Sequence, residues 1–206
     1  MTETTTDRTD QPPTSLPPQA GARCFGDGDP LYEAYHDTEW GLPVHGEAEL
    51  FERIALEGFQ SGLSWITVLR KRPAFREVFH GFDPAAVAAF TERDVERLLT
   101  DARIIRNRMK IEATVVNARA LTALHGQGRT LDELFWSFAP DDPGRERPAL
   151  WADVPAQTGE SKALSKALKK EGFRFVGPTT MYAAMQACGL VDDHLSTCPA
   201  VTTPRP

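Results

Sequence analysis

The sequence predicts an all-α protein with a single compact core, and three observations support this class. Apolar residues recur at three- and four-residue spacing, as between Leu50 and Ile54, which is the period of a buried helix face. No segment shows the alternation of apolar and polar residues that is typical of a half-buried strand. Helix start signals also recur, because a capping aspartate precedes a first-turn proline at Asp29-Pro30 and at Asp83-Pro84.

The length of the chain fits one domain with tails. At 206 residues and 41% hydrophobic content, the chain can bury one sizeable core. Residues 1–22 are rich in Thr, Pro, Asp and Gln and contain no apolar run, which predicts a disordered N-terminal tail. We expect a single domain over 23–198 and a short C-terminal tail over 199–206.

Charge and hydropathy limit the partners. The net charge of −6 argues against an indiscriminate nucleic-acid binder, since such proteins are usually basic. Two basic clusters, within 103–119 and 162–174, keep a one-sided basic surface open, although charge alone favours solvated helix faces. No stretch approaches the length of a membrane span, and the N-terminus lacks the apolar run of a secretory signal. We therefore expect a cytoplasmic monomer with no membrane partner.

The first predicted helices lie in the N-terminal half. A short helix starts at Pro30 and presents two tyrosines and His36 on adjoining faces. A longer helix is expected over 47–56. A further apolar run over 63–69 is expected to stop at Pro73, because proline disrupts a helix interior.

Helix signals continue in the second half. Residues 84–90 follow a cap and a first-turn proline, and 91–94 resemble a capping signal for the next helix. Apolar residues over 104–121 recur at helical spacing, and 131–138 supply further core residues. Residues 139–159 contain four prolines and predict a long irregular loop, for which the sequence indicates no role beyond a surface crossing.

A helix-hairpin-helix candidate follows this loop. A helix is expected from Ser161 to Gly172, and a turn closing at Gly177 leads into another helix. Glycines let backbone N–H groups approach a phosphate, and Lys169 and Lys170 precede the turn, which suggests a DNA-backbone anchor. An ordinary connection between two helices is the alternative that this pattern leaves open.

Glu57 continues an apolar helical stripe that should point inward. One interpretation is a pocket carboxylate, held ready for a ligand with N–H groups or positive charge, with Trp65 as an apolar wall. Gly58 and Gly62 suggest a helix break or a close approach to the backbone. The alternative is a glutamate at the stripe's margin that reaches water or pairs with a nearby arginine.

Cysteine and histidine residues suggest a metal site. His194 and Cys198 are spaced one helical turn apart, and Cys24 and His36 are the best remaining ligands. Four such ligands form a closed tetrahedral zinc site, which is structural and ties the N-terminal segment to the C-terminal one. Two free cysteines and two surface histidines are the alternative.

Several strings of residues occur in one order from Arg23 to Cys198. They are Asp29-Pro-Leu-Tyr32, Tyr35-His-Asp37, Glu39-Trp-Gly41, Leu56-Glu-Gly58, Gly62-Leu-Ser-Trp-Ile-Thr-Val-Leu69, Leu164-Ser-Lys-Ala-Leu-Lys-Lys170, Phe175-Val-Gly177 and Met185-Gln-Ala-Cys-Gly-Leu190. With these strings, the chain resembles the bacterial 3-methyladenine DNA glycosylase I family of the helix-hairpin-helix glycosylase superfamily. So many matched strings in one order are highly specific.

The resemblance implies roles for the pocket residues. Glu57, Tyr35 and Trp65 are expected to form the base pocket, with Trp65 stacking on the damaged base and Glu57, the catalytic candidate, accepting hydrogen bonds from it. Tyr32 and Trp40 are expected to line the same cavity.

The resemblance also implies one structural zinc ion (Zn2+) on Cys24, His36, His194 and Cys198. The segment 24–29 departs from the family's pattern, because it is one residue shorter and has Phe25 where a nearby tryptophan is usual. The resemblance therefore does not carry over to the pocket wall at this point.

The implied function is a monofunctional DNA repair glycosylase that flips out and excises 3-methyladenine from double-stranded alkylated DNA. No lysine occurs in the presumed pocket stretch, so strand cleavage is not expected. Asp192 and Asp193 lie near the place where many glycosylases of the superfamily carry a catalytic aspartate. Two alternatives remain: a non-catalytic, zinc-stabilised module that binds damaged DNA, and a zinc hydrolase that uses His36 and Glu39.

Overall fold

The computed structural model describes residues 21–142 and 145–200. Within these residues every regular element is helical, so the predicted all-α class is confirmed. Most of the two predicted tails lies outside the described residues, and the proposed domain bounds stay a prediction. The elements are α1 (Pro30–Thr38), α2 (Glu47–Gln60), α3 (Trp65–Val78), η1 (His80–Phe82), α4 (Pro84–Ala88), α5 (Glu92–Thr100), α6 (Arg108–His125), α7 (Leu131–Trp136), η2 (Trp151–Asp153), α8 (Gly159–Lys170) and α9 (Pro178–Ala187).

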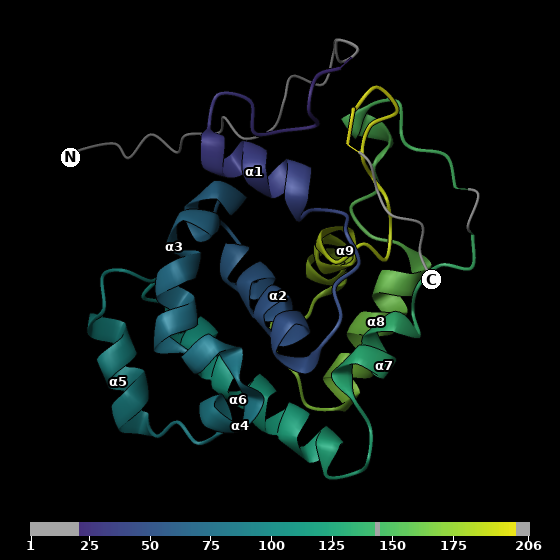
Figure 1. The fold of residues 1–206 in the computed structure, drawn as a ribbon. Coiled ribbons are helices and arrows are strands. Elements are labelled where there is room, and N and C mark those ends of the chain that lie inside the picture. The colour runs from purple at the N-terminus through teal and green to yellow at the C-terminus, as the bar shows by residue number, and fades with distance from the viewer. Residues whose placement is uncertain (1–20, 143–144, 201–206) are drawn as a thin grey trace, which may run out of the picture.

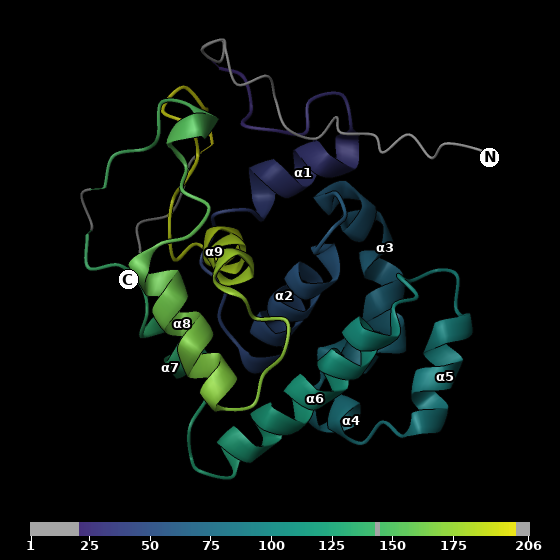
Figure 2. The same cartoon turned by 180° about the vertical axis from the view of Figure 1, so that it is seen from behind.

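Helix α2 lies at the centre of the molecule, with α3 on one side and α9 on the other (Figure 1). The view from behind shows α6 crossing below it (Figure 2). Ten consecutive residues of α2, from Leu50 to Phe59, are buried. A helix that is surrounded on all sides buries polar as well as apolar positions, which explains how Glu57 comes to lie inside the protein.

The predicted capping signals are confirmed. The Asp29 carboxylate accepts hydrogen bonds from two backbone N–H groups of the first turn of α1, at 3.0 and 3.3 Å. Asp83 caps α4 by accepting one hydrogen bond, from the Ala86 N–H, and Thr91 and Asp94 form the capping box of α5. These side chains satisfy N–H groups that a helix start leaves unpaired, and Asp29 thereby fixes where the two tyrosines of α1 point.

The prediction that Pro73 ends a helix is wrong, because α3 continues through it to Val78. Proline in a helix interior costs roughly 3 kcal/mol, since one hydrogen bond is lost and the ring crowds the preceding turn. The last turn of α3 buries Phe75 and Val78 in the core. Burial of two such side chains contributes roughly 3 to 6 kcal/mol, which is enough to offset the proline.

The two glycines near Glu57 have separate roles. Gly58 lies inside α2, where an added Cβ atom would come within 3.4 Å of the Phe175 Cβ, so α2 closely approaches the turn after α8. Gly62 follows α2 with φ of +81°, a conformation that favours glycine. The helix break and the close approach that the sequence suggested are therefore both present, at different residues.

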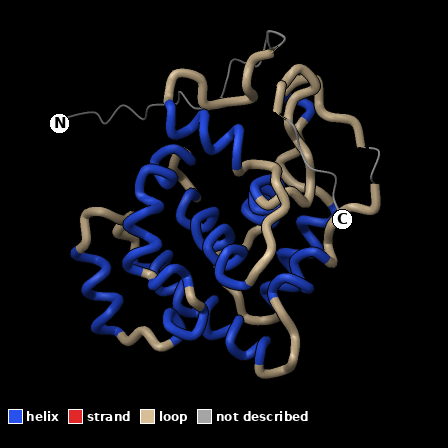
Figure 3. The backbone as a smooth tube through the Cα atoms, in the orientation of Figure 1, coloured by secondary structure: helices blue, strands red, loops and turns tan. Residues whose placement is uncertain are grey.

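The long loop between α7 and α8 runs beside the C-terminal segment (Figure 3). The backbone N–H of Ser196 donates to the Pro148 carbonyl at 2.9 Å, and Arg147 donates to the carbonyls of Cys198 and Ala200. The loop is therefore held against the protein by its own hydrogen bonds. Within the described residues, no helix is long and apolar enough to cross a membrane.

Candidate functional site

A cavity of about 630 Å³ opens between the N-terminal half of the molecule and the C-terminal helix α9. This volume is within the usual range of small-molecule sites. One side comes from α1, α2, the start of α3 and the residues next to α1, and the other comes from the long loop and α9. The lining residues are Phe25, Tyr32, Tyr35, Trp40, Glu57, Gln60, Trp65, Trp151, Ala152, Val154, Pro155, Ala156, Thr179, Tyr182, Ala183 and Gln186.

Glu57 lines this cavity and is only 6% exposed. Among the described residues, no side chain or backbone group pairs with its carboxylate, so the alternative of a marginal glutamate paired with an arginine is wrong. Burial raises the pKa of Glu57 to about 8, and the charge of Arg53, one turn earlier in α2, offsets part of this rise. The cavity thus holds an acid with unused hydrogen-bonding capacity.

The four aromatic residues predicted for the pocket all line the same cavity as Glu57. The rings of Tyr35 and Trp65 lie 5.3 Å apart between centroids, and both side chains are buried. Phe25 joins them, with its ring 4.8 Å from Tyr32 and 5.0 Å from Trp40. The departure from the family's pattern at this segment therefore still supplies an aromatic wall.

Tyr35 is held by a charged cluster that the sequence did not reveal. The guanidinium groups of Arg53 and Arg72 each lie 6.0 Å from the centre of its ring. Glu39 accepts hydrogen bonds from both arginines at 2.6 to 2.8 Å. Burial raises the pKa of Tyr35 well above its usual value, and the nearby Glu57 carboxyl adds to this effect. Because Glu39 is occupied with two arginines, nothing supports the zinc hydrolase alternative.

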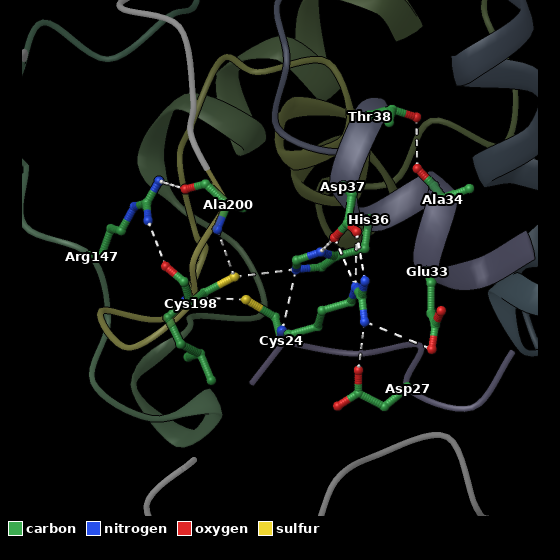
Figure 4. Close-up of polar contacts among 12 residues, drawn as sticks. Cys24, Asp27, Glu33, Ala34, His36, Asp37, Thr38, Arg147, Cys198 and Ala200 are labelled. Carbon is green, nitrogen blue, oxygen red and sulfur yellow. Dashed lines mark hydrogen bonds and ion pairs between the residues drawn. The ribbon is translucent and has the colours of Figure 1, made fainter. Parts of the chain in front are cut away.

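A group of side chains that could hold a metal ion lies next to the cavity. One ligand atom from each of Cys24, His36 and Cys198 falls within 4.8 Å of the others, and all three residues are buried. Figure 4 shows the three side chains pointing toward one another. The His36 Nε2 faces the sulfurs, while its Nδ1 lies 2.8 Å from an Asp37 oxygen. A carboxylate behind the ligating histidine is the usual arrangement around a protein-bound metal.

His194 lies beside this group but outside the three-residue cluster. Its ring is 5.1 Å from the His36 ring, and its Nδ1 lies 2.9 Å from Asp192. The Nε2 is buried and has no hydrogen-bond partner within residues 21–142 and 145–200, which is costly unless something binds there. The expected helical turn from His194 to Cys198 is absent, since this segment is irregular and closes with a hydrogen bond from the Cys198 N–H to the Leu195 carbonyl.

Backbone N–H groups also point at the sulfurs. The Leu195 N–H donates to the Cys24 sulfur at 3.2 Å, and the Ala200 N–H lies 3.5 Å from the Cys198 sulfur. Burial raises the pKa of the Cys24 thiol to about 12, despite the hydrogen bond from Leu195. The donor set fits zinc, because two sulfurs and one or two imidazole nitrogens converge in a buried place.

The hairpin candidate lies behind α2. Lys169 and Lys170 are exposed in the last turn of α8, and Gly172, with φ of +96°, follows them. The buried Asn117 of α6 exchanges two hydrogen bonds with the backbone of Arg174, at 2.7 and 3.0 Å. Helix α9 starts after Gly177 without a side-chain cap, and the same helix lines the cavity. The turn is thus joined to the wall of the cavity through α9.

The C-terminal wall rests on Asp193. Its carboxylate accepts hydrogen bonds from Tyr182 at 2.6 Å and from Gln186 at 2.8 Å, and both of these residues line the cavity. Arg145 of the long loop lies 2.6 Å from the other carboxylate oxygen. Asp193 is therefore a support of the wall, and the sequence showed only its proximity to α9. Asp192 instead contacts His194 and Arg147.

Comparisons with known proteins agree on one family. The model of the methyladenine glycosylase family matches residues 25–201. The chain is 54% identical over 170 residues to DNA-3-methyladenine glycosylase 1 of Escherichia coli. The match covers 82% of this chain and 91% of the relative. The chain is also 49% identical over 173 residues to DNA-3-methyladenine glycosylase of Haemophilus influenzae, with 84% and 94% covered.

Solved structures support the same relationship. A crystal structure of 3-methyladenine DNA glycosylase I superimposes with a TM-score of 0.81 at 52% identity, covering 84% of this chain and 94% of that one. A tyrosine-to-phenylalanine variant of 3-methyladenine DNA glycosylase I, in complex with 3-methyladenine, gives a TM-score of 0.81 at 35% identity, covering 86% and 96%. The chain therefore belongs to the methyladenine glycosylase family.

Proposed function

We propose that this chain is a DNA glycosylase that excises 3-methyladenine from alkylated double-stranded DNA in the cytoplasm. The observation that carries the proposal is Glu57, a buried acid that lies inside an aromatic cavity and has no partner in the described part of the chain. The relatives named for this activity support it, as does the related protein whose structure contains 3-methyladenine.

The chemistry of the damaged base explains why an aromatic cavity with one acid is sufficient for base release. Alkylation at N3 makes adenine cationic, so the glycosidic bond is already weak and the base leaves as a neutral purine. A water molecule then attacks the sugar carbon, and little acid catalysis is needed. The remaining work is to extrude the nucleotide, which costs a few kcal/mol, and to hold the base. Trp65 and its neighbours supply stacking, and Glu57 supplies an acceptor for the base's N–H groups.

Selectivity follows from charge. Aromatic faces attract cations, and a carboxylate inside a low-dielectric cavity attracts them further. Unmodified adenine carries no such charge and gains less from both contacts. None of the described residues that line the cavity is a lysine, which supports base release without strand cleavage, because a lyase step needs an amine nucleophile.

We infer that α8, the turn and α9 act as a helix-hairpin-helix anchor for the DNA backbone. The exposed Lys169 and Lys170 supply positive charge. The backbone N–H groups of residues 172–174 donate inside the protein, whereas those of residues 175–177 have no partner among the described residues and are open to a phosphate. Because α9 also lines the cavity, a phosphate bound at this turn places the duplex beside Glu57.

We infer one structural zinc ion on Cys24, His36, Cys198 and His194. The unpartnered Nε2 of His194 supports the fourth position, since a metal would satisfy it. The ion, when bound, links the segment before α1 to the segment after α9. A closed ligand set leaves no place for a catalytic water, so its contribution is to the fold.

Asp193→Asn is expected to reduce stability more than catalysis. The substitution removes the charged partner of Arg145 and weakens the hydrogen bonds from Tyr182 and Gln186. We expect a melting temperature several degrees lower, with the rate of base release per folded molecule within a few-fold of wild type. Trp65→Ala should reduce that rate more. Calorimetry and single-turnover base release test this ranking, and the reverse order would show that the chemistry depends on Asp193.

Base release is expected to depend on pH through Glu57. Below a pH of about 8 the carboxyl of the empty cavity is mainly protonated, because burial raises its pKa. A cationic base binds the ionised form better, so kcat/KM should rise with pH through about 8 and level off roughly one unit above that pKa. Glu57→Gln should abolish this rise. A rise of equal size in the variant would assign it to another group.

The function is tested by chromatography of the bases released when the protein meets methylated duplex DNA. Release of 3-methyladenine without 7-methylguanine is the expected result. Tight binding of the same DNA with no released base would instead favour the non-catalytic damaged-DNA-binding module. Gel analysis of the same reactions should show intact strands until the abasic sites are cleaved by alkali.

A further inference from the structure

The long loop between α7 and α8 contributes a tryptophan to the cavity. Trp151 lines it together with Val154, Pro155 and Ala156 from the same loop. The Trp151 side chain is half-buried. Nothing in the sequence distinguishes this residue from a surface tryptophan, because the loop has no helical or strand period. Its place on the wall is a result of how the loop is held.

Trp151 is held in a defined orientation. Its indole Nε1 donates to the Cys24 carbonyl at 3.0 Å, which joins the long loop to the segment before α1. The loop is also fixed to the segment after α9, because the Ser196 N–H donates to the Pro148 carbonyl. Because a backbone carbonyl already pairs with the indole N–H, the ring can line the cavity without another polar partner.

The ring extends the aromatic wall around Phe25. It lies 6.4 Å from the Phe25 ring, at 40° between planes, and 6.3 Å from the Trp40 ring, at 48°. Both neighbours also line the cavity. Phe25 is smaller than tryptophan, so Trp151 adds aromatic surface where this segment departs from the family's usual sequence. Its contacts thus continue the wall from the N-terminal half of the protein onto the loop.

We propose that Trp151 is a substrate-binding residue that contacts the extruded purine and limits the width of the cavity. The proposal rests on the proposed function, since it assigns the purine as the occupant. Aromatic side chains in contact with a base contribute 1 to 3 kcal/mol by alanine substitution, which corresponds to roughly 5- to 150-fold in affinity. A half-buried tryptophan on the rim should fall near the lower end of this range.

The test measures the affinity for free 3-methyladenine by calorimetry in the wild type, Trp151→Ala and Trp151→Phe. We expect roughly tenfold weaker binding for Trp151→Ala and a smaller loss for Trp151→Phe, which keeps a ring but loses the hydrogen bond to Cys24. The KM for base release from methylated duplex should rise in the same order, with kcat changing less.

Trp136 supplies the matched control. It is also half-buried, and its Nε1 also donates to a backbone carbonyl, that of Val44, at 3.0 Å, but it does not line the cavity. Trp136→Phe and Trp151→Phe should lower the melting temperature to a similar extent, since each loses one hydrogen bond. Only the Trp151 variants should bind the purine more weakly.

The outcomes separate the two proposals. Unchanged affinity and KM in both Trp151 variants, with base release by the wild type intact, would overturn the role of Trp151 and leave the glycosylase function standing. Weaker purine binding in the Trp151 variants, with no base release by the wild type, would support Trp151 and overturn the glycosylase. If Trp151→Ala does not fold, the purine affinities of Trp151→Phe and Trp136→Phe test the role of Trp151.

Discussion

Glu57→Gln is expected to reduce kcat/KM for release of 3-methyladenine by roughly 10- to 100-fold at pH 8, because a hydrogen bond to a charged acceptor contributes about 1.5 to 3 kcal/mol. The amide keeps the size of the side chain but cannot carry the charge that a cationic base attracts. Single-turnover release from methylated duplex, measured beside the wild type, gives this value.

Glu52→Gln is the control for this substitution. Glu52 is buried on the same helix and forms an ion pair with Arg76 at 2.8 Å, outside the cavity. It should leave the rate of base release within a few-fold of wild type. Equal losses in the two variants would mean that any buried charge on α2 matters, and would remove the special role of Glu57.

Stability should move in the opposite direction in Glu57→Gln. The folded-state pKa of Glu57, about 8, lies above the usual value of 4.5, so burial of its ionised form destabilises the protein as pH rises through this range. At pH 9 the Gln variant should therefore melt at a higher temperature than the wild type. At pH 4, where the carboxyl is protonated in both states, the difference should disappear. This pattern separates a functional acid from a structural one.

Loss of the metal is expected to have the largest effect on stability. The purified protein should contain one zinc ion per chain, and Cys198→Ala should remove it. Metal-binding free energy of a structural site is folding free energy, and 1 kcal/mol shifts the melting temperature by about 2 to 4 °C in a chain of this size. We expect a decrease of roughly 10 °C or more, measured by calorimetry together with metal analysis.

Cys188→Ala is the matched control, because Cys188 is also a buried free cysteine but lies outside the group proposed to hold the metal. It should retain the zinc and lose about 1 to 2 kcal/mol from the cavity that it leaves. A wild-type protein without zinc, or a Cys198→Ala variant as stable as Cys188→Ala, would contradict the structural site.

Local signals in the sequence predicted much of the fold. The cap at Asp29, the capping box at Thr91 and the glycine after α8 each act within a few residues, so one short string contains all that is needed. The inward position of Glu57 followed from the same kind of pattern, because helical spacing shows which residues lie on one face of a helix. Pro73 was misjudged because the burial of the residues after it outweighs a local penalty.

The parts of the site that the sequence did not predict depend on contacts between distant segments. Glu39 meets Arg72 33 residues away, and Trp151 meets Cys24 127 residues away. No periodicity reports such pairs, because each residue taken alone fits an ordinary surface position. The wall formed by the long loop was missed for this reason, and the family resemblance did not supply it.

The assignment of the cavity is tested most directly by a crystal structure of this chain grown with 3-methyladenine. We expect the purine inside the cavity, with its face against Trp65 and an N–H group within 2.7 to 3.2 Å of a Glu57 carboxylate oxygen. A base bound elsewhere on the protein, or one that fills the cavity without a polar contact to Glu57, would contradict the proposed recognition.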